Sequence, residues 1–280
     1  MNQLNVNLPE LPYAVSEAMN RLRINIKFCG KNTRKILLTS CQPNEGKSTI
    51  SAYLWKMLAE AGFPTVLVDV DLRKSVMKTR FQMDYDDDTT MGLNHYLSGM
   101  AEYEDVVYST NIPNGYMVPC TQLLENPSAL LEDIRFKELL NTLSENYRFV
   151  IIDSPPLGSV ADGALIASLC DGAVLVVRAG TTPRTLIKQS LYEIQQSGCK
   201  LLGTVLNRAD VKGRAYSFIQ NTLFGKYCTF NMVLQPVDRQ SICSAISYAC
   251  SLHKSKSSIA IRSFSHFCPC LHFTFEIISR

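Results

Sequence analysis

The sequence predicts an α/β protein built from three layers, a parallel β-sheet with helices on both faces. Short apolar segments alternate along the chain with longer amphipathic segments, and this alternation is typical of parallel sheets joined by crossover helices. Several apolar segments run directly into charged or polar residues. Because sheets of this kind bind ligands at the carboxyl ends of their strands, the same pattern predicts where a site would lie.

The elements follow one another in a regular order. Apolar residues at helical spacing predict helices, and short apolar runs that end in turn residues predict buried strands. Gly198 closes the last predicted helix, where glycine commonly ends helices. In chain order the elements are a helix at 13–29, a strand at 35–41, a helix at 48–61, a strand at 65–71, a short helix within 89–99, a strand at 115–120, a helix at 127–147, a strand within 148–156, a helix at 160–170, a strand at 171–180, a helix at 182–198 and a strand at 200–210.

Composition excludes several classes of protein. The chain of 280 residues is 46% hydrophobic and 19% charged, as expected for a globular protein with a sizeable core. A net charge of only +3 argues against a nucleic-acid partner, which usually requires a strongly basic surface. The chain contains no apolar run of 18 or more residues and no signal peptide at its start, so we expect a cytoplasmic protein with reduced cysteines.

The segment 36–54 ends like a phosphate-binding loop. Gly46, Lys47 and Ser48 stand between a predicted strand and a predicted helix, where free backbone N–H groups and the helix dipole attract an anion. Lys47 would contact the outer phosphates and Ser48 a magnesium ion. The first glycine of the pattern G-x-x-x-x-G-K-[ST] is replaced by Cys41, and Asn44 in the same loop tolerates left-handed backbone geometry.

Carboxylates follow two other predicted strands. Asp69 and Asp71 stand two residues apart in "VLVDVDLR", with Arg73 after them, and in an extended segment their side chains point to the same side. Asp153 ends the strand of "FVIIDSPP" and suits a contact to magnesium, either through water or from behind the direct ligands. Together with the phosphate loop, these residues predict a nucleotide and magnesium site in a P-loop NTPase fold.

At these motifs the chain resembles a family. "CQPNEGKST", "VLVDVDLR" and "FVIIDSPP" resemble the Walker A, Walker A′ and Walker B motifs of the bacterial tyrosine kinases of the capsule and exopolysaccharide type. Further likeness lies in "EAMNRLRINIKF", "MGLNHYLSG", "ENPSALLEDIRFKELL" and "LLGTVLNRAD", so that the resemblance covers roughly residues 13–226. The family belongs to the deviant P-loop ATPases, which include MinD- and ParA-like proteins.

The resemblance implies an ATP-dependent, autophosphorylating protein tyrosine kinase with ATP and Mg²⁺ as cofactors. Asp69 would take the proton from a tyrosine hydroxyl, and Asp71 would assist at the metal with Arg73 near the same pocket. The implied catalytic residues are Lys47, Asp69, Asp71 and Arg73. The implied nucleotide-binding residues are Pro43, Asn44, Glu45, Gly46, Lys47, Ser48, Thr49 and Asn207. The implied metal ligands are Ser48, Asp71 and Asp153.

The resemblance also implies partners and a domain division. The partners are a membrane-anchored activator of the polysaccharide co-polymerase type, which would recruit the chain to the inner face of the cell membrane, other copies of the chain in a ring, and tyrosine-containing protein substrates. The division is an N-terminal helix and oligomerisation segment (1–30), an ATP-binding kinase domain (31–227) and a C-terminal tail rich in Cys and Ser (228–280).

Three features depart from the family pattern. Asn44 stands where these kinases usually carry glycine. Asn20 replaces the first arginine of the family's E-x-x-R-x-x-R motif, between Glu17 and Arg23, and an amide cannot make a bidentate ion pair. The family's C-terminal tyrosine cluster is reduced to Tyr227 and Tyr248, with Tyr216 shortly before them.

Two other functions remain open at this level. The first is a ParA- or MinD-like ATPase switch, in which water receives the phosphoryl group; the residue Gln42, where such proteins carry a signature lysine, argues against it. The second is a non-catalytic scaffold that binds nucleotide, which the altered tail would favour.

Overall fold

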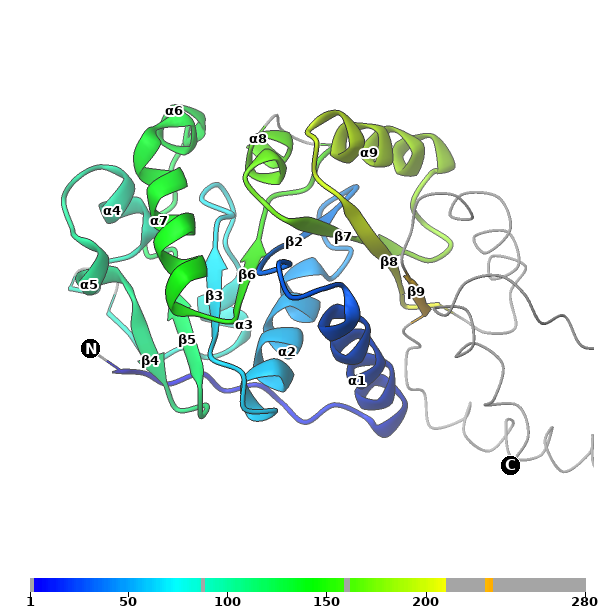
Figure 1. The fold of residues 1–280 in the computed structure, drawn as a ribbon, viewed down its shortest axis with the longest axis horizontal. Helices are drawn as coiled ribbons and strands as arrows, with labels where there is room; N and C mark the ends of the chain where they lie inside the picture. Colours follow the sequence, from blue (N-terminus) through cyan, green and yellow to red (C-terminus); the bar gives the residue numbers. More distant parts are fainter. Residues whose placement is uncertain (1–2, 87–88, 159–161, 210–229, 234–280) are drawn as a thin grey trace, which may run out of the picture. The chain divides into compact units, whose positions relative to one another are not determined.

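A single mixed β-sheet organises the molecule. The computed structural model describes residues 3–86, 89–158, 162–209 and 230–233 (Figure 1). Among these residues, the sheet has the strand order β1-β4-β5-β3-β6-β2-β7-β8-β9. The strands are β1 (Gln3–Leu4), β2 (Lys35–Ser40), β3 (Thr65–Asp69), β4 (Tyr108–Thr110), β5 (Gly115–Val118), β6 (Phe149–Asp153), β7 (Gly172–Arg178), β8 (Leu201–Asn207) and β9 (Phe230–Val233).

Helices connect most of these strands and cover the sheet. The helices are α1 (Tyr13–Phe28), α2 (Lys47–Glu60), α3 (Met77–Arg80), α4 (Leu93–Leu97), α5 (Tyr103–Val106), α6 (Ser128–Glu132), α7 (Ile134–Asn146), α8 (Asp162–Ser168) and α9 (Arg184–Gln196). The α/β class predicted from the sequence is therefore confirmed. The short elements β1, β4, α3 and α5 were not predicted, because each is too short to show a period of its own. The strand β9 was not predicted because it lies in the segment assigned to the C-terminal tail.

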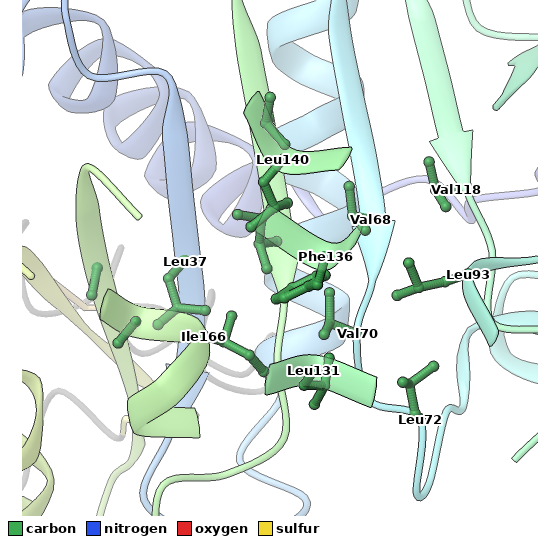
Figure 2. Close-up of a cluster of buried hydrophobic side chains, with 14 of the residues drawn as sticks. Leu37, Val68, Val70, Leu72, Leu93, Val118, Leu131, Phe136, Leu140 and Ile166 are labelled. Carbon is green, nitrogen blue, oxygen red and sulfur yellow. The ribbon is translucent and has the colours of Figure 1, made fainter. Parts of the chain in front are cut away.

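The central strands bury both of their faces. Alternate residues of β2 point to opposite sides: Leu37 belongs to a core cluster with α7, α8 and α9, whereas Ile36 and Leu38 belong to a cluster with α1 and α2. The helices accordingly lie on both sides of the sheet (Figure 1). Figure 2 shows side chains of the first cluster, in which Phe136 of α7 lies close to Val70, the residue that follows β3. This double covering explains why the strand sequences are apolar without alternation.

One edge of the sheet is not parallel. The other described pairs of adjacent strands are parallel, but β4 and β5 are antiparallel, with Ser109 opposite Tyr116. The predicted parallel sheet is therefore mostly parallel, with one antiparallel pair among the described strands. Residues 111–114 form a short connection that includes the left-handed Asn114 (φ 59°). A connection of this length can join only antiparallel neighbours, because a parallel pair needs a crossover of a dozen or more residues.

The predicted helix at 127–147 is two helices. Asp133 has an extended backbone (φ −65°, ψ 148°) that ends α6 and begins α7. Its carboxylate accepts a hydrogen bond of 2.9 Å from the backbone N–H of Arg135, as an N-cap residue does. Helical spacing continues across this point in the sequence, and the break depends on the cap.

Several sequence predictions fall on residues that the structure does not describe. Of the predicted tail 228–280, only Phe230–Val233 is described, as the strand that pairs with β8. The tyrosines Tyr216, Tyr227 and Tyr248 lie outside the described residues. Within the described part of the chain, no helix is long and apolar enough to cross a membrane.

Asp133→Ala should destabilise the protein through loss of the cap. Removing an N-cap side chain typically lowers the free energy of unfolding by about 1 kcal/mol. Urea-induced unfolding of the wild type, Asp133→Ala and Asp133→Asn would measure it, because asparagine caps a helix about as well as aspartate. Equal stability of all three proteins would contradict the assignment of the cap.

Candidate active site

The loop between β2 and α2 supplies the phosphate-binding geometry. Gly46 has a left-handed backbone (φ 98°) and directly precedes the first residue of α2, so the free N–H groups of that helix open into the loop. Asn44 is also left-handed (φ 65°), and thus takes the conformation expected from its residue type. Pro43 and Asn44 are exposed on the outside of the loop.

Lys47 lies between two carboxylates. Its Nζ is 2.9 Å from Asp71 Oδ2 and 3.3 Å from Asp153 Oδ2, and also donates to Ser48 Oγ at 3.2 Å. These residues are buried. Burial alone would lower the pKa of Lys47, but the negative charges of Asp153 and Asp71 outweigh it and raise that pKa. The structure therefore brings together four of the residues predicted from sequence, at the carboxyl ends of the central strands.

Strand register places the remaining carboxylate. Asp69 and Asp153 are Cα partners in the parallel pair β3 and β6, so their side chains share one face of the sheet. Asp69 accepts hydrogen bonds from the hydroxyl of Ser75 and, at 3.3 Å, from the backbone N–H of Asp71. Burial and the nearby charge of Asp153 raise the pKa of Asp69 to about 8. Burial also raises the pKa of Asp153, with the charge of Lys47 opposing the rise.

Ser51 is a site residue that the sequence analysis missed. Its hydroxyl donates to Asp153 Oδ1 at 2.9 Å and fixes the orientation of that carboxylate. Ser51 follows Lys47 by four residues in α2, so it lies on the same helical face. That spacing is a signal from which it could have been predicted.

Glu45 and Asn207 hold the loop itself. The Glu45 carboxylate turns inward and accepts backbone N–H groups of the loop, while Asn207 Nδ2 donates to the Glu45 carbonyl oxygen at 2.8 Å. A Cβ atom on Gly46 would come within 2.2 Å of Asn207 Nδ2, so only glycine allows this close approach. Asn207, from the end of β8, thereby tightens the phosphate loop.

A cavity of about 590 Å³ opens beside the loop. Asn44, Gly46, Thr49 and Asn207, all predicted nucleotide-binding residues, line part of its wall. Apolar residues of α1 line another part. Thr49 also accepts a hydrogen bond from Arg80 at 3.1 Å.

Arg73 makes its contacts away from Lys47. Its guanidinium pairs with Asp162 Oδ2 at 2.8 Å and donates to the carbonyl oxygen of Glu125 at 2.8 Å and to Ser128 Oγ at 3.1 Å. Asp162 is 2% exposed and begins α8. These bonds tie the segment after β3 to the starts of α6 and α8. Arg73 therefore orients the segment that carries Asp71, and no sequence signal marked Asp162 as its partner.

The donor set fits a nucleotide with magnesium. Magnesium prefers oxygen ligands and is commonly held by one or two carboxylates together with substrate phosphates, and Ser48, Asp71 and Asp153 offer a hydroxyl and two carboxylates within reach of one cation, Lys47. Among the described residues, no group of three or more His, Cys, Asp or Glu side chains could hold a metal ion by itself.

Comparison with known proteins gives the same class. Residues 33–196 match the family model of an AAA domain. The chain is 40% identical to the tyrosine-protein kinase CpsD of Streptococcus agalactiae over 210 residues, which are 75% of this chain and 90% of that protein. The kinase domain of Escherichia coli tyrosine kinase ETK superposes with a TM-score of 0.66 at 28% identity, over 74% of this chain and 84% of that domain.

A more distant structure shares only the fold. The septum site-determining protein MinD from Pyrococcus horikoshii, solved with Mg-ADP, superposes with a TM-score of 0.58 at 23% identity, over 80% of this chain and 90% of that protein. The sheet and the loop before α2 define the class to which all these proteins belong, the P-loop ATPases. Within that class, the identity to CpsD over most of both chains decides the family. The chain belongs to the bacterial tyrosine-protein kinases, and the alternative of a ParA- or MinD-like switch is not favoured.

Asp162→Asn should destabilise the protein far more than loss of an exposed ion pair. The substitution leaves the partly buried Arg73 without its charged partner, which should lower the free energy of unfolding by about 2 kcal/mol. The matched control is Glu102→Gln, which removes the partner of Arg135 in a pair of 3.9 Å whose Glu102 side chain is 76% exposed; such pairs contribute about 0–1 kcal/mol. Denaturant unfolding of both variants measures the difference, and similar losses would contradict the structural role of Asp162.

Asp69→Asn should change how stability depends on pH. The folded protein holds the Asp69 proton more tightly than the unfolded chain, because the pKa is about 8 in the fold against an ordinary value of 3.8. The stabilisation from Asp69 is therefore complete below a pH of about 4 and is lost as the pH rises through about 8.

The Asp69→Asn variant lacks this titration. We expect it to lose less stability than the wild type between pH 5 and pH 8, by at least about 1 kcal/mol. Urea unfolding without nucleotide, at several pH values in that interval, measures both proteins. Parallel dependence on pH would contradict the raised pKa.

Proposed function

We propose that this kinase transfers the γ-phosphoryl group of ATP to tyrosine hydroxyls, with Mg²⁺, in the regulation of capsular or exopolysaccharide synthesis. The observation that carries the proposal is the position of Lys47, within 3.3 Å of both Asp71 and Asp153 at the start of α2. A cation, two acidic groups and free helix N–H groups at one point match what phosphoryl transfer requires, which is chiefly positioning and neutralisation of charge.

Lys47 and the helix N-terminus would bind the phosphates. The Lys47 ammonium would exchange its carboxylate partners for oxygens of the β- and γ-phosphates, a step favoured by its burial. Ser48, Asp71 and Asp153 would hold the magnesium ion, which when bound neutralises phosphate charge. Ser51 would keep Asp153 oriented through its hydrogen bond.

Asp69 would accept the proton of the incoming tyrosine hydroxyl. It is buried at the end of β3, two residues before Asp71, and its carboxylate is oriented by the hydroxyl of Ser75. Without a ligand this carboxyl group has a pKa of about 8, so it would act as general base in its deprotonated form, and a pKa near the operating pH suits that role. Arg73, predicted as catalytic, would instead act through Asp162 by holding the segment that carries Asp71.

The nucleoside would occupy the cavity beside the loop. Asn44, Gly46, Thr49 and Asn207 line it, which supports their predicted role as nucleotide-binding residues. Pro43 would form the outer edge of the loop.

Partners are proposed from the family resemblance. A membrane-anchored activator of the polysaccharide co-polymerase type would bring the chain to the inner face of the membrane. Self-association into a ring would be weaker than in relatives with the complete arginine motif, because Arg23 donates to Asn20 Oδ1 of its own helix through Nε (3.0 Å) and Nη2 (2.7 Å).

The test is formation of phosphotyrosine. The purified full chain is incubated with the cytoplasmic fragment of the activator and labelled ATP, with and without magnesium. We expect labelled tyrosine in the wild type and its loss in Lys47→Met. In Asp69→Asn the rate should fall by about 100-fold or more, the contribution typical of a general base.

The matched control is Lys56→Met, in the same helix. Lys56 pairs with Glu60 at 3.8 Å on the outside of α2, so this variant should keep wild-type activity. Tyrosine labelling that survives in Lys47→Met would contradict the role of Lys47. Release of free phosphate without phosphotyrosine would contradict the kinase reaction and favour an ATPase switch.

A further inference from the structure

We infer that Glu45 is a positioning residue, whose buried side chain fixes the backbone of the phosphate loop. It thereby has the structural role of the glycine that is missing at Cys41. Sequence reasoning grouped Glu45 with the residues that contact the nucleotide. Its contacts indicate a different role in the same site. The inference rests on the proposed function, since it concerns how the same loop is prepared for the nucleotide.

The Glu45 carboxylate is directed into the protein. Glu45 is 2% exposed, although its neighbours Pro43 and Asn44 lie at the surface. Its Oε2 accepts the backbone N–H of Cys41 at 2.7 Å and that of Gln42 at 3.1 Å. Charged acceptors of this kind make short, strong hydrogen bonds with amide groups.

A further contact ties the carboxylate to the rest of the sheet. The other carboxylate oxygen, Oε1, accepts a hydrogen bond from the hydroxyl of Thr182, which lies between β7 and α9. The Glu45 carbonyl oxygen is in turn held by Asn207 at the end of β8. Both the side chain and the backbone of Glu45 are thus fixed by elements distant in sequence.

These bonds define which N–H groups remain for the ligand. The first two amides of the loop are satisfied internally by Glu45, so they are not available to a phosphate. The N–H groups of Gly46 and of the first turn of α2 remain for an anion. Lys47, which begins α2 and pairs with Asp71, belongs to the same turn. The loop is closed around its own carboxylate before a nucleotide arrives, and less ordering remains to be done on binding.

The reason for a glutamate here follows from Cys41. Glycine at the start of such a loop gives the backbone conformational freedom, which a residue with a Cβ atom such as Cys41 lacks. Cys41 is fully buried, and burial raises the pKa of its thiol to about 12, so the thiol is inert. The Glu45 carboxylate accepts a hydrogen bond from the N–H of Cys41, and this bond sets the path of the loop instead.

The experiment compares three variants of the full chain. Glu45→Ala removes the acceptor and leaves two inward-facing N–H groups unpaired. Glu45→Gln keeps an acceptor for both N–H groups, and its amide can face Thr182, because that hydroxyl can donate to the carbonyl oxygen of Arg178 at 3.1 Å. Glu60→Ala, at the exposed end of α2, is the matched control.

Two quantities are measured for each protein: the dissociation constant for Mg-ADP, by calorimetry, and the melting temperature without nucleotide. We expect Glu45→Ala to bind at least about tenfold more weakly, the effect of leaving one or two buried N–H groups unpaired. Glu45→Gln should stay within about threefold of the wild type, and Glu60→Ala should be unchanged.

The outcomes separate this inference from the proposed function. A lower melting temperature in Glu45→Ala with unchanged affinity for Mg-ADP would overturn the inference and leave the proposed function standing. Equal weakening in Glu45→Ala and Glu45→Gln would also overturn it, because glutamine keeps the acceptor. A wild-type protein that does not bind Mg-ADP would overturn the proposed function and the inference with it.

Discussion

The ion pairs of Lys47 with Asp71 and Asp153 are the interaction on which the site depends. Parallel pairing of β3 with β6 forces Asp69 and Asp153 side by side at the carboxyl ends of these strands. Buried carboxylates at such close quarters are unfavourable unless a cation compensates them. Lys47 is held at the start of α2 by the loop after β2, which lies next to β6 in the sheet. The same topology that concentrates negative charge therefore supplies the positive charge that makes it tolerable.

The sequence predicted the central sheet because the signals there are local. The strands β2, β3, β6, β7 and β8 are continuous apolar runs with polar ends, and they were found with small errors at their ends. The antiparallel strand β4 and the break at Asp133 were not found. Both depend on details that periodicity does not contain: a short connection that dictates strand direction, and one carboxylate that caps a helix in the middle of a continuous helical pattern.

The site residues likewise divide into those that local sequence signals predict and those whose partners they do not predict. Lys47, Ser48, Asp71 and Asp153 meet as expected, since a motif that follows a strand in a parallel sheet must lie at its carboxyl edge. The partners of Arg73 and Glu45 could not be predicted. Asp162 is 89 residues from Arg73, and Thr182 is 137 residues from Glu45. No spacing in the sequence relates such pairs, and only the folded arrangement of β3, β7 and their following segments brings them into contact.

The two departures in the phosphate loop have different physical meanings. Asn44 replaces a usual glycine but adopts the left-handed conformation that glycine would take (φ 65°), a conformation that asparagine tolerates better than most residues. That substitution therefore keeps the path of the backbone. Gly46 cannot be replaced in the same way, because the side chain of Asn207 occupies the space beside it. The loop thus needs glycine where another side chain approaches, and can omit it where backbone N–H groups donate to the Glu45 carboxylate and so set the path of the backbone.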